Sequence, residues 1–293
     1  MTKLPTANLG RTGISVTRLG YGAAHRKPIN NAQRKLILNS VITSGINFVD
    51  TAGCYGRDKD NSESLIGRYL SDVQNDYTIA TKCGCQNTAN RWTEKNIFAD
   101  VYTSLERMKI QQIPILQLHG PSVKECEDNQ VVNSLQKLQS EGLVKWIGIS
   151  TSLPDLETFF NWDVFDVFQL PYSLLNRKHH TWITKLSEKG HGIIVNNGIA
   201  QGEPHIGTGE TSVWEKFNHA HLNDLLAANE DPTQFALRFA FTHPYIDTNI
   251  VGTTNINHLE KNIQTILLGK LEQDIYKEAN RRLDNLDTSI NVT

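Results

Sequence analysis

Ile46-Asn47-Phe48-Val49-Asp50 is a short apolar run that ends in a carboxylate, and two later runs have the same form. Tyr77-Thr78-Ile79-Ala80-Thr81-Lys82 ends in an ammonium group, and Ile115-Leu116-Gln117-Leu118-His119 ends in an imidazole. Short runs rich in β-branched residues are typical of buried strands. We therefore expect three strands, each with a polar group at its carboxyl end.

Segments of helical period separate such runs along almost the whole chain. Eight strands are predicted, at residues 16–22, 46–52, 77–82, 115–119, 144–150, 167–171, 192–197 and 248–252. Eight helices are predicted, at about residues 31–43, 62–70, 93–107, 130–140, 153–161, 178–189, 232–242 and 256–268. The alternation is typical of βα units, and eight units close an α/β barrel of the (β/α)8 or TIM type. Because such barrels of roughly 250 residues are single units, we expect one domain over residues 1–293.

Four local features add to this picture. Asp231 and Pro232 predict the start of a helix, because an Asp side chain caps free amides and Pro is accommodated in the first turn. The glycine-containing segment 8–16 predicts a hairpin that plugs the barrel bottom. Residues 198–217, rich in glycine, predict a long loop that is either a binding loop or a plain insertion. The amphipathic segment 271–286 predicts a final helix on the outside.

The composition excludes several function classes. The net charge of -2 gives no basic field for nucleic acid or for an acidic membrane. No apolar run approaches the roughly 18 residues of a membrane span, and the first residues lack a secretory signal. The four cysteines form no paired C-x-x-C knuckles, so no metal site is expected. We expect a soluble cytoplasmic protein with reduced thiols.

Tyr55 adds a phenol to the groups at the strand ends, where the active sites of barrels lie. A tyrosine has a pKa of about 10 and acts as an acid or base near neutrality only if neighbours stabilise its anion. The Lys82 ammonium would do this, and the Asp50 carboxylate would keep Lys82 charged. His119 would donate to, or orient, a carbonyl oxygen. The set predicts proton transfer to a carbonyl or from an alcohol.

Each member of this set also has an ordinary structural interpretation. An Asp after a strand commonly caps a helix or forms a turn. A lone Tyr commonly packs, a lone Lys is commonly solvated, and a lone His commonly satisfies a local hydrogen bond. The joint position of the four groups after three successive strands favours the catalytic interpretation.

Several short motifs together resemble the aldo-keto reductase family, from Leu9 to about Asn262. They are Leu9-Gly10-Arg11-Thr12-Gly13, Leu19-Gly20-Tyr21-Gly22, Asn47-Phe48-Val49-Asp50-Thr51-Ala52 with Tyr55-Gly56, Thr81-Lys82, Leu118-His119-Gly120, Gly148-Ile149-Ser150, and Gly252-Thr253-Thr254 with Leu259 and Asn262. The resemblance implies a (β/α)8 barrel that binds NADP(H), or less often NAD(H), without a Rossmann domain. The chain accordingly has no G-x-G-x-x-G after a strand.

The resemblance also implies roles for the four polar residues. Tyr55 would be the proton donor to the carbonyl in reduction, Lys82 and Asp50 would tune it, and His119 would orient the substrate. The hydride would come from the nicotinamide, because no side chain can deliver one.

Cofactor contacts are implied in the same way. Ser150 and Gln169 match positions that hydrogen-bond the nicotinamide carboxamide, although both could simply satisfy turns. A second set matches the surroundings of the nicotinamide and the loop and helix start that hold the adenosine and its phosphate: Gly22, Asn196, Gly252, Thr253, Thr254, Asn255, His258 and Asn262. A helix amino end suits an anion, because it offers free amides.

Three positions depart from the family pattern. Asn196 stands where many members place a Tyr under the nicotinamide, and Thr151 stands where an Asn often helps to hold the carboxamide. His258 replaces an Arg that commonly grips the 2′-phosphate of NADP(H), and no Lys stands near Thr253. A neutral His forfeits a charge-assisted contact of roughly 1.5 to 3 kcal/mol, so the sequence leaves the choice between NADP(H) and NAD(H) open.

The substrate pocket would be lined by loops after the first, second, fourth and seventh strands. Its candidate residues are His25, Cys54, Trp92, Trp214 and Tyr172. Basic residues nearby could meet an anionic substrate, although exposed loop cations are more commonly just solvated: Arg26, Arg57 and Lys59. A short tail after the last predicted helix predicts a wide, wet mouth that suits sugars and other polar carbonyl compounds.

We therefore predict an NAD(P)(H)-dependent oxidoreductase that interconverts an aldehyde or ketone and its alcohol, as an aldehyde reductase or a sugar dehydrogenase does. The expected partner is this small substrate, and the expected state is a monomer or small homo-oligomer. One alternative is a cofactor-binding regulatory subunit on the same barrel with little turnover. Another is a metal-dependent barrel hydrolase using His119, which is disfavoured because the other paired histidines lie on predicted helices: His179, His180, His219 and His221.

Overall fold

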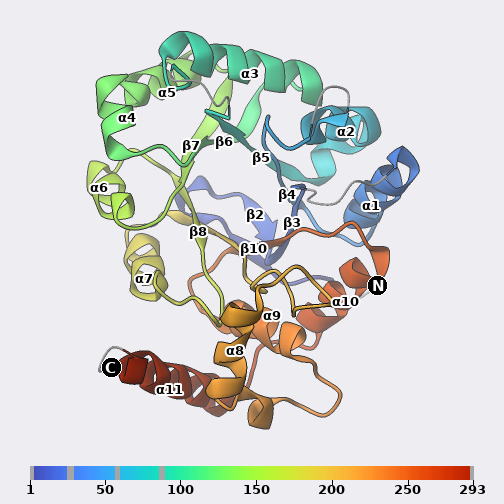
Figure 1. Ribbon diagram of the computed structural model, residues 1–293. Helices are drawn as coiled ribbons and strands as arrows, with labels where there is room; N and C mark the ends of the chain where they lie inside the picture. The colour runs from blue at the N-terminus through green and yellow to red at the C-terminus, as the bar shows by residue number, and fades with distance from the viewer. Residues whose placement is uncertain (1–2, 25–29, 57–59, 86–89, 291–293) are drawn as a thin grey trace.

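Eight parallel strands close into a barrel in the computed structural model, which describes residues 3–24, 30–56, 60–85 and 90–290. The order around the barrel is β10-β3-β4-β5-β6-β7-β8-β9, and helices surround the strands (Figure 1). The strands are β3 (Leu19–Gly22), β4 (Phe48–Asp50), β5 (Thr78–Cys83), β6 (Ile113–His119), β7 (Val144–Ser150), β8 (Val167–Pro171), β9 (Gly192–Asn196) and β10 (Thr248–Val251). The predicted (β/α)8 architecture is confirmed.

The eight predicted helices are all present with small shifts in their bounds. They are α1 (Asn31–Thr43), α2 (Ser62–Tyr69), α3 (Glu94–Met108), α5 (Val131–Ser140), α6 (Asp155–Trp162), α7 (His180–Glu188), α9 (Pro232–Thr242) and α10 (Ile256–Leu267). The predicted cap of α9 is present: the Asp231 side chain accepts from the Gln234 amide at 2.8 Å, and the Gln234 side chain accepts from the Asp231 amide at 3.2 Å. None of the helices in the described part of the chain combines the length and the apolar character that a membrane span requires.

Two sequence expectations need correction. The first predicted strand was too long, because residues Ser15–Thr17 form β2, which pairs antiparallel with β1 (Thr6–Asn8), and the barrel strand begins only at Leu19. The predicted long loop after β9 was also too long, because it contains the start of α8 (Thr211–His219). Trp214 and Phe217 are buried one turn apart on α8, and this apolar spacing was the missed signal.

Three further helical elements accompany the barrel. A short helix, α4 (Val123–Asp128), precedes α5, and a 3-10 turn, η4 (Leu222–Leu225), follows α8. The predicted final helix is α11 (Gln273–Ile290), which lies on the outside of the barrel beside α8 and η4 (Figure 1). Arg177 in the loop before α7 pairs with Asp284 of α11 at 2.8 Å, so the helix is fastened to the barrel wall.

The hairpin made by β1 and β2 closes the bottom of the barrel, as predicted. Leu9 and Val16 are completely buried and join the cluster of side chains inside the barrel. Gly10 lies against the start of β9, where a Cβ would come within 2.2 Å of the Gly192 nitrogen. A side chain at position 10 would therefore push the plug out of place.

Alternation along the strands places an apolar set and then a polar set inside the barrel. Phe48, Ala80, Ile115, Val167 and Ile194 belong to the interior cluster. Successive side chains of a strand point to opposite faces, so residues two positions further on share the same interior face. Those residues are Asp50, Lys82, Gln117, Gln169 and Asn196. The interior thus changes from apolar to polar toward the carboxyl ends of the strands.

Candidate active site

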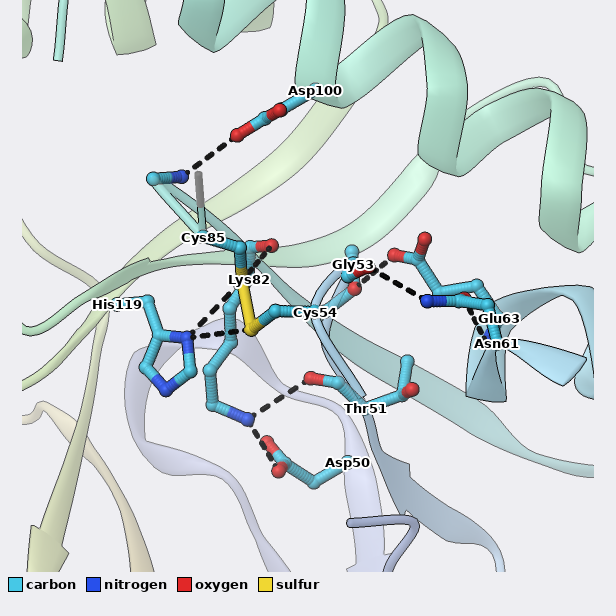
Figure 2. The surroundings of a disulfide bond; sticks show 12 residues. Asp50, Thr51, Gly53, Cys54, Asn61, Glu63, Lys82, Cys85, Asp100 and His119 are labelled. Carbon is cyan, nitrogen blue, oxygen red and sulfur yellow. Dashed lines mark hydrogen bonds and ion pairs between the residues drawn. A yellow bond between two sulfur atoms is a disulfide. The ribbon is translucent and has the colours of Figure 1, made fainter. Parts of the chain in front are cut away.

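A buried ion pair lies at the centre of the polar interior. Lys82 Nζ is 2.5 Å from Asp50 Oδ1 and donates to the Thr51 carbonyl oxygen at 3.0 Å (Figure 2). The exposed fractions of the two residues are 1% each. Because an unpaired buried charge is strongly destabilising, each residue needs the other. The structure therefore brings together these two members of the predicted set.

Two glutamines hold the second oxygen of the carboxylate. Gln117 Nε2 donates to Asp50 Oδ2 at 2.9 Å, and Gln169 Nε2 donates to the same oxygen at 2.7 Å. Gln117 was missed by the sequence analysis, although it lies two residues before His119 on the same face of β6. Space for it comes from Gly148, where a Cβ would lie 3.3 Å from Gln117 Cγ and 2.8 Å from the Val167 carbonyl oxygen. Both glutamines orient the carboxylate toward Lys82.

A tight turn after β4 positions Tyr55. The Tyr55 amide donates to the Ala52 carbonyl at 3.1 Å, and the Tyr55 carbonyl accepts from the Ser62 amide at 2.7 Å. Gly53 O accepts from Asn61 Nδ2 at 2.7 Å (Figure 2). These bonds fix the turn on the amino end of α2 and bring the phenol ring to 5.1 Å from Lys82 Nζ.

The electrostatics of Tyr55 differ from the sequence expectation. Burial raises the pKa of the hydroxyl, and this effect is larger than the opposing influence of the Lys82 charge and of a hydrogen bond with Lys82. Asp50 raises the pKa further. The pKa of Tyr55 is therefore raised overall, whereas the sequence suggested a lowered pKa. The phenol is therefore protonated at neutral pH, which is the state that a proton donor requires.

His119 completes the set on the last residue of β6. Its ring centroid lies 5.9 Å from that of Tyr55, with the two rings edge to face. Burial and the nearby Lys82 charge lower the pKa of His119 to about 4. The imidazole is therefore neutral at neutral pH, with a proton on only one of its two nitrogens.

The predicted nicotinamide contacts form a chain of side chains beside the ion pair. Gln169 Oε1 accepts from the Ser150 hydroxyl at 3.1 Å and from Asn196 Nδ2 at 3.2 Å. Among the described residues, Asn196 Oδ1 is a buried acceptor to which no protein group donates. A buried acceptor without a donor is costly. A carboxamide N–H group placed here would satisfy it.

The predicted adenosine-side residues gather where β10 leads into α10. Gly252 lies against Gly22, where a Cβ on Gly252 would be 2.7 Å from the Gly22 carbonyl oxygen. Asn255 caps α10 by accepting from the Asn257 amide at 2.9 Å, and Thr253 accepts from the Asn255 amide at 3.1 Å. The other three members follow on the same segment: Thr254 in the loop, with His258 and Asn262 one turn apart on α10. The close approach of the two glycine backbones and the amino end of α10 suit a phosphate-bearing chain.

The predicted substrate residues other than Cys54 either lie outside the described part of the chain or, in the case of the three aromatic residues, are buried. His25, Arg26, Arg57 and Lys59 lie outside the described residues. The exposed fractions of Trp92, Trp214 and Tyr172 are only 2%, 5% and 1%. Trp92 packs against Gly84, where a Cβ would come within 2.1 Å of the indole, and Trp214 Nε1 donates to the Ala200 carbonyl oxygen at 3.2 Å. Trp92 and Trp214 thus pack against loop residues, and the Tyr172 hydroxyl lies 2.9 Å from His180 Nδ1 of α7.

The cysteines contradict the expectation of reduced thiols. Cys54 and Cys85 are joined in a disulfide with a Cα–Cα distance of 5.4 Å (Figure 2). The pair is not conspicuous in the sequence, because the two residues are 31 positions apart. Cys83 and Cys126 are free and buried, and burial raises the pKa of both thiols, that of Cys126 to about 12.

One group in the described part of the chain has the residue types and spacing to hold a metal ion. It consists of Cys54, Cys85 and His119, whose ligand atoms lie within 4.8 Å of one another. While the two sulfurs are bonded to each other, they are not thiolates and are poor metal ligands. The paired histidines lie elsewhere, with His180 at the start of α7 and His219 at the end of α8.

Fold and site together define an α/β-barrel protein with polar groups gathered at the carboxyl ends of the strands. The Aldo/keto reductase family model matches residues 18–283, and the chain belongs to this family. It is therefore an oxidoreductase by family, as the resemblance implied.

Individual relatives are distant. L-galactose dehydrogenase from Arabidopsis thaliana is 27% identical over 290 residues, covering 91% of this chain and 89% of the relative. NADH-specific methylglyoxal reductase from Escherichia coli (strain K12) is 29% identical over 220 residues, covering 67% and 66%. An aldo-keto reductase from Bacillus halodurans in its holo form superimposes with a TM-score of 0.83 at 22% identity, covering 95% of this chain and 96% of that chain. This last likeness concerns the fold.

Proposed function

We propose that the protein interconverts an aldehyde or ketone and its alcohol with NAD(P)(H) as the hydride carrier, and that Tyr55 is the general acid and base. The observation that supports this most strongly is the buried Lys82–Asp50 pair beside the phenol. A charged pair withdrawn from water costs free energy to desolvate. Its position at the carboxyl end of the barrel, next to two further ionisable groups, favours a chemical role over a structural one.

Each residue would have a distinct role in carbonyl reduction. Tyr55, kept protonated by burial, gives its proton to the carbonyl oxygen. The Lys82 ammonium then stabilises the phenolate that remains, and the ion pair with Asp50 holds the ammonium in place beside the ring. Neutral His119 donates a hydrogen bond to the same carbonyl oxygen when its proton is on the nitrogen that faces the substrate. In alcohol oxidation the same groups work in reverse.

The dinucleotide, when bound, supplies or accepts the hydride. Ser150, Gln169 and Asn196 would hold the carboxamide, and the unpaired acceptor Asn196 Oδ1 supports this placement. The backbone at Gly22 and Gly252, which carries no side chains, would receive the pyrophosphate. The amino end of α10 would hold the adenosine side.

The cofactor preference rests on the adenosine side of this site. His258 is exposed on the first turn of α10, and the sequence provides no Arg at that position to grip a 2′-phosphate. A relative described as an NADH-specific methylglyoxal reductase shows that a family member can prefer NADH. We propose that the site accepts both cofactors.

The proposed substrate class is sugars and other small polar carbonyl compounds. It is supported by the relative L-galactose dehydrogenase, which matches this chain over most of its length. The exposed fractions of the aromatic candidates also favour this class, because Trp92 and Trp214 do not present an apolar wall to the mouth.

The test compares the wild type with Tyr55→Phe. Both are titrated with NADH and NADPH by fluorescence, and turnover is then measured on a panel of aldoses and small aldehydes. We expect the variant to bind cofactor within about twofold of the wild type and to lose most of the 10²- to 10⁴-fold that general acid catalysis contributes. Robust turnover by Tyr55→Phe would reject the proposed acid. Cofactor binding by the wild type without steady-state turnover would instead support the regulatory alternative.

A further inference from the structure

Two cysteines lie beside the proposed proton-transfer groups without belonging to them. Cys54 immediately precedes Tyr55 in the turn after β4, and Cys85 lies two residues after the end of β5, the strand that carries Lys82. Their disulfide joins the two loops at the mouth of the barrel (Figure 2). Any reaction of this pair therefore takes place next to the site.

Both sulfurs contact the same nitrogen of His119. Cys85 Sγ is 3.2 Å from His119 Nδ1, and Cys54 Sγ is 3.5 Å from it. The other ring nitrogen, Nε2, points away from the sulfurs (Figure 2). The sulfurs therefore influence one side of the ring, and the opposite side is left to face a substrate.

The oxidation state of the sulfurs determines what they can offer to Nδ1. A thiol S–H can donate a weak hydrogen bond, whereas a disulfide sulfur has no proton and can only accept. A neutral imidazole has one proton to place, and a partner at one nitrogen selects the tautomer. Beside a disulfide, Nδ1 keeps the proton and Nε2 is left as an acceptor. Beside thiols, Nδ1 accepts and Nε2 carries the proton.

The accessibility of the four cysteines singles out the same pair. Cys54 is exposed and Cys85 is half-buried, whereas the exposed fractions of Cys83 and Cys126 are 1% and 2%. Thiol exchange requires that a reagent reaches the sulfur. A small disulfide can therefore reach Cys54 first.

We propose that Cys54 and Cys85 form a reversible oxidation site that reacts with small disulfides of the glutathione type and sets the tautomer of His119. This inference rests on the proposed function only where it concerns turnover. The Cys54 thiolate attacks one sulfur of the small disulfide, forms a mixed disulfide and releases one thiolate. The Cys85 thiolate then attacks the Cys54 sulfur and releases the second. Two protein thiols are oxidised, one small disulfide is reduced to two thiols, and the two cysteine protons pass to the products.

Oxidation would weaken carbonyl reduction, because Nε2 could no longer donate to the carbonyl oxygen. In a reducing compartment the dithiol form would predominate, and the donor would be available. The pair would thus make the activity of the site respond to the thiol–disulfide balance of its surroundings.

The first measurement needs no turnover. The full-length protein is equilibrated in mixtures of oxidised and reduced glutathione, alkylated and weighed intact, and its histidine tautomers are followed by 15N NMR. We expect two alkylatable thiols to disappear together and reappear on reduction, and the His119 signals to change from the Nε2–H to the Nδ1–H form on oxidation. Thiols that stay free in the oxidised mixture, or a tautomer that does not change, would overturn the proposal. Binding of one zinc ion per reduced protein, with both thiols protected from alkylation, would also overturn the proposal, because that outcome indicates a Cys2His metal site.

The second measurement compares turnover of the oxidised and reduced forms. We expect at least a tenfold lower rate in the oxidised wild type, and no dependence on the redox mixture in the double variant Cys54→Ser/Cys85→Ser, which has neither thiol of the pair. Cys126→Ser, a change in a buried free cysteine far from the pair in sequence, serves as the matched control and should keep the redox dependence. Equal rates in both redox forms of the wild type would refute the regulatory part. Absence of turnover in the reduced wild type would count against the proposed function instead. The mass and tautomer measurements would still show whether the two cysteines form a reversible oxidation site.

Discussion

Replacing Asp50 by Asn removes the anion from the buried pair and leaves the ammonium of Lys82 in the barrel interior. Lys82 then keeps only neutral acceptors, such as the Thr51 carbonyl oxygen. The two glutamine amides that donate to the carboxylate would face an amide with a single acceptor oxygen. The substitution therefore disrupts several interactions without a large change in volume.

The burial of the pair sets the expected magnitude. The exposed fractions of the Lys82 and Asp50 side chains are 0% and 2%. Removing one partner of such a pair costs about 3 to 5 kcal/mol. At roughly 2 to 4 °C per kcal/mol for a chain of this order of size, the melting temperature should fall by about 6 to 20 °C. Lys82→Met should cost a similar amount, because it leaves the carboxylate without a cation.

The double variant Asp50→Asn/Lys82→Met separates the charge effect from packing. With both charges gone, we expect it to be more stable than either single variant, and the coupling between the sites to reach at least about 2 kcal/mol. Urea unfolding monitored by tryptophan fluorescence and far-UV circular dichroism measures each free energy. Asp128→Asn is a control at the exposed Lys124–Asp128 pair and should cost less than about 1 kcal/mol. If the two single losses simply add in the double variant, the pair is not electrostatically coupled and the reasoning fails.

Three more predictions follow from other contacts. Gln117→Leu should lower the unfolding free energy by about 1.5 to 3 kcal/mol, measured with urea, because it removes a hydrogen bond to a buried carboxylate. Burial raises the pKa of Asp247 to about 6, so the folded protein binds this proton more tightly than the unfolded chain does. The free energy of unfolding should therefore be highest below a pH of about 4 and should fall, by at most about 3 kcal/mol, as the pH rises through about 6. Asp247→Asn should abolish that change in unfolding free energies measured from pH 4 to 7. His258→Arg should tighten NADPH binding about tenfold or more and leave NADH binding unchanged in fluorescence titrations.

The barrel was predictable because its signals are local and repeated. Apolar runs alternate with helical periods, and caps such as Asp231 fix helix starts without tertiary information. The errors occur where the signal is not local. Residues 16 and 19 lie in one predicted strand, yet the first belongs to the plug and the second to the barrel, because pairing partners decide the boundary.

The polar groups of the site were partly predictable for the same reason. Asp50, Lys82 and His119 end apolar runs, and a polar group that ends such a run is conspicuous in the sequence. Gln117 is hidden inside its run between Leu116 and Leu118. The period of two on a strand is sufficient to find it, because a residue two positions before His119 must share its face. The net direction of the Tyr55 pKa was not predictable, since it depends on how deeply the turn buries the ring.

The proximity of Cys54 and Cys85 could be predicted from the order and register of the strands. β4 and β5 are neighbours in the barrel, and Asp50 faces Ala80 across them, an offset of 30 positions. Applied to the residues after the strands, that offset places position 54 opposite position 84, one residue from Cys85. A predicted barrel thus brings the two cysteines to one part of the rim before any coordinates are known. Whether their sulfurs also reach His119 depends on β6, which adjoins β5 on its other side, with Cys83 facing Leu118. Three consecutive strands therefore suffice to bring a thiol pair and an imidazole together, and the same three strands place the lysine, the carboxylate and the phenol beside them.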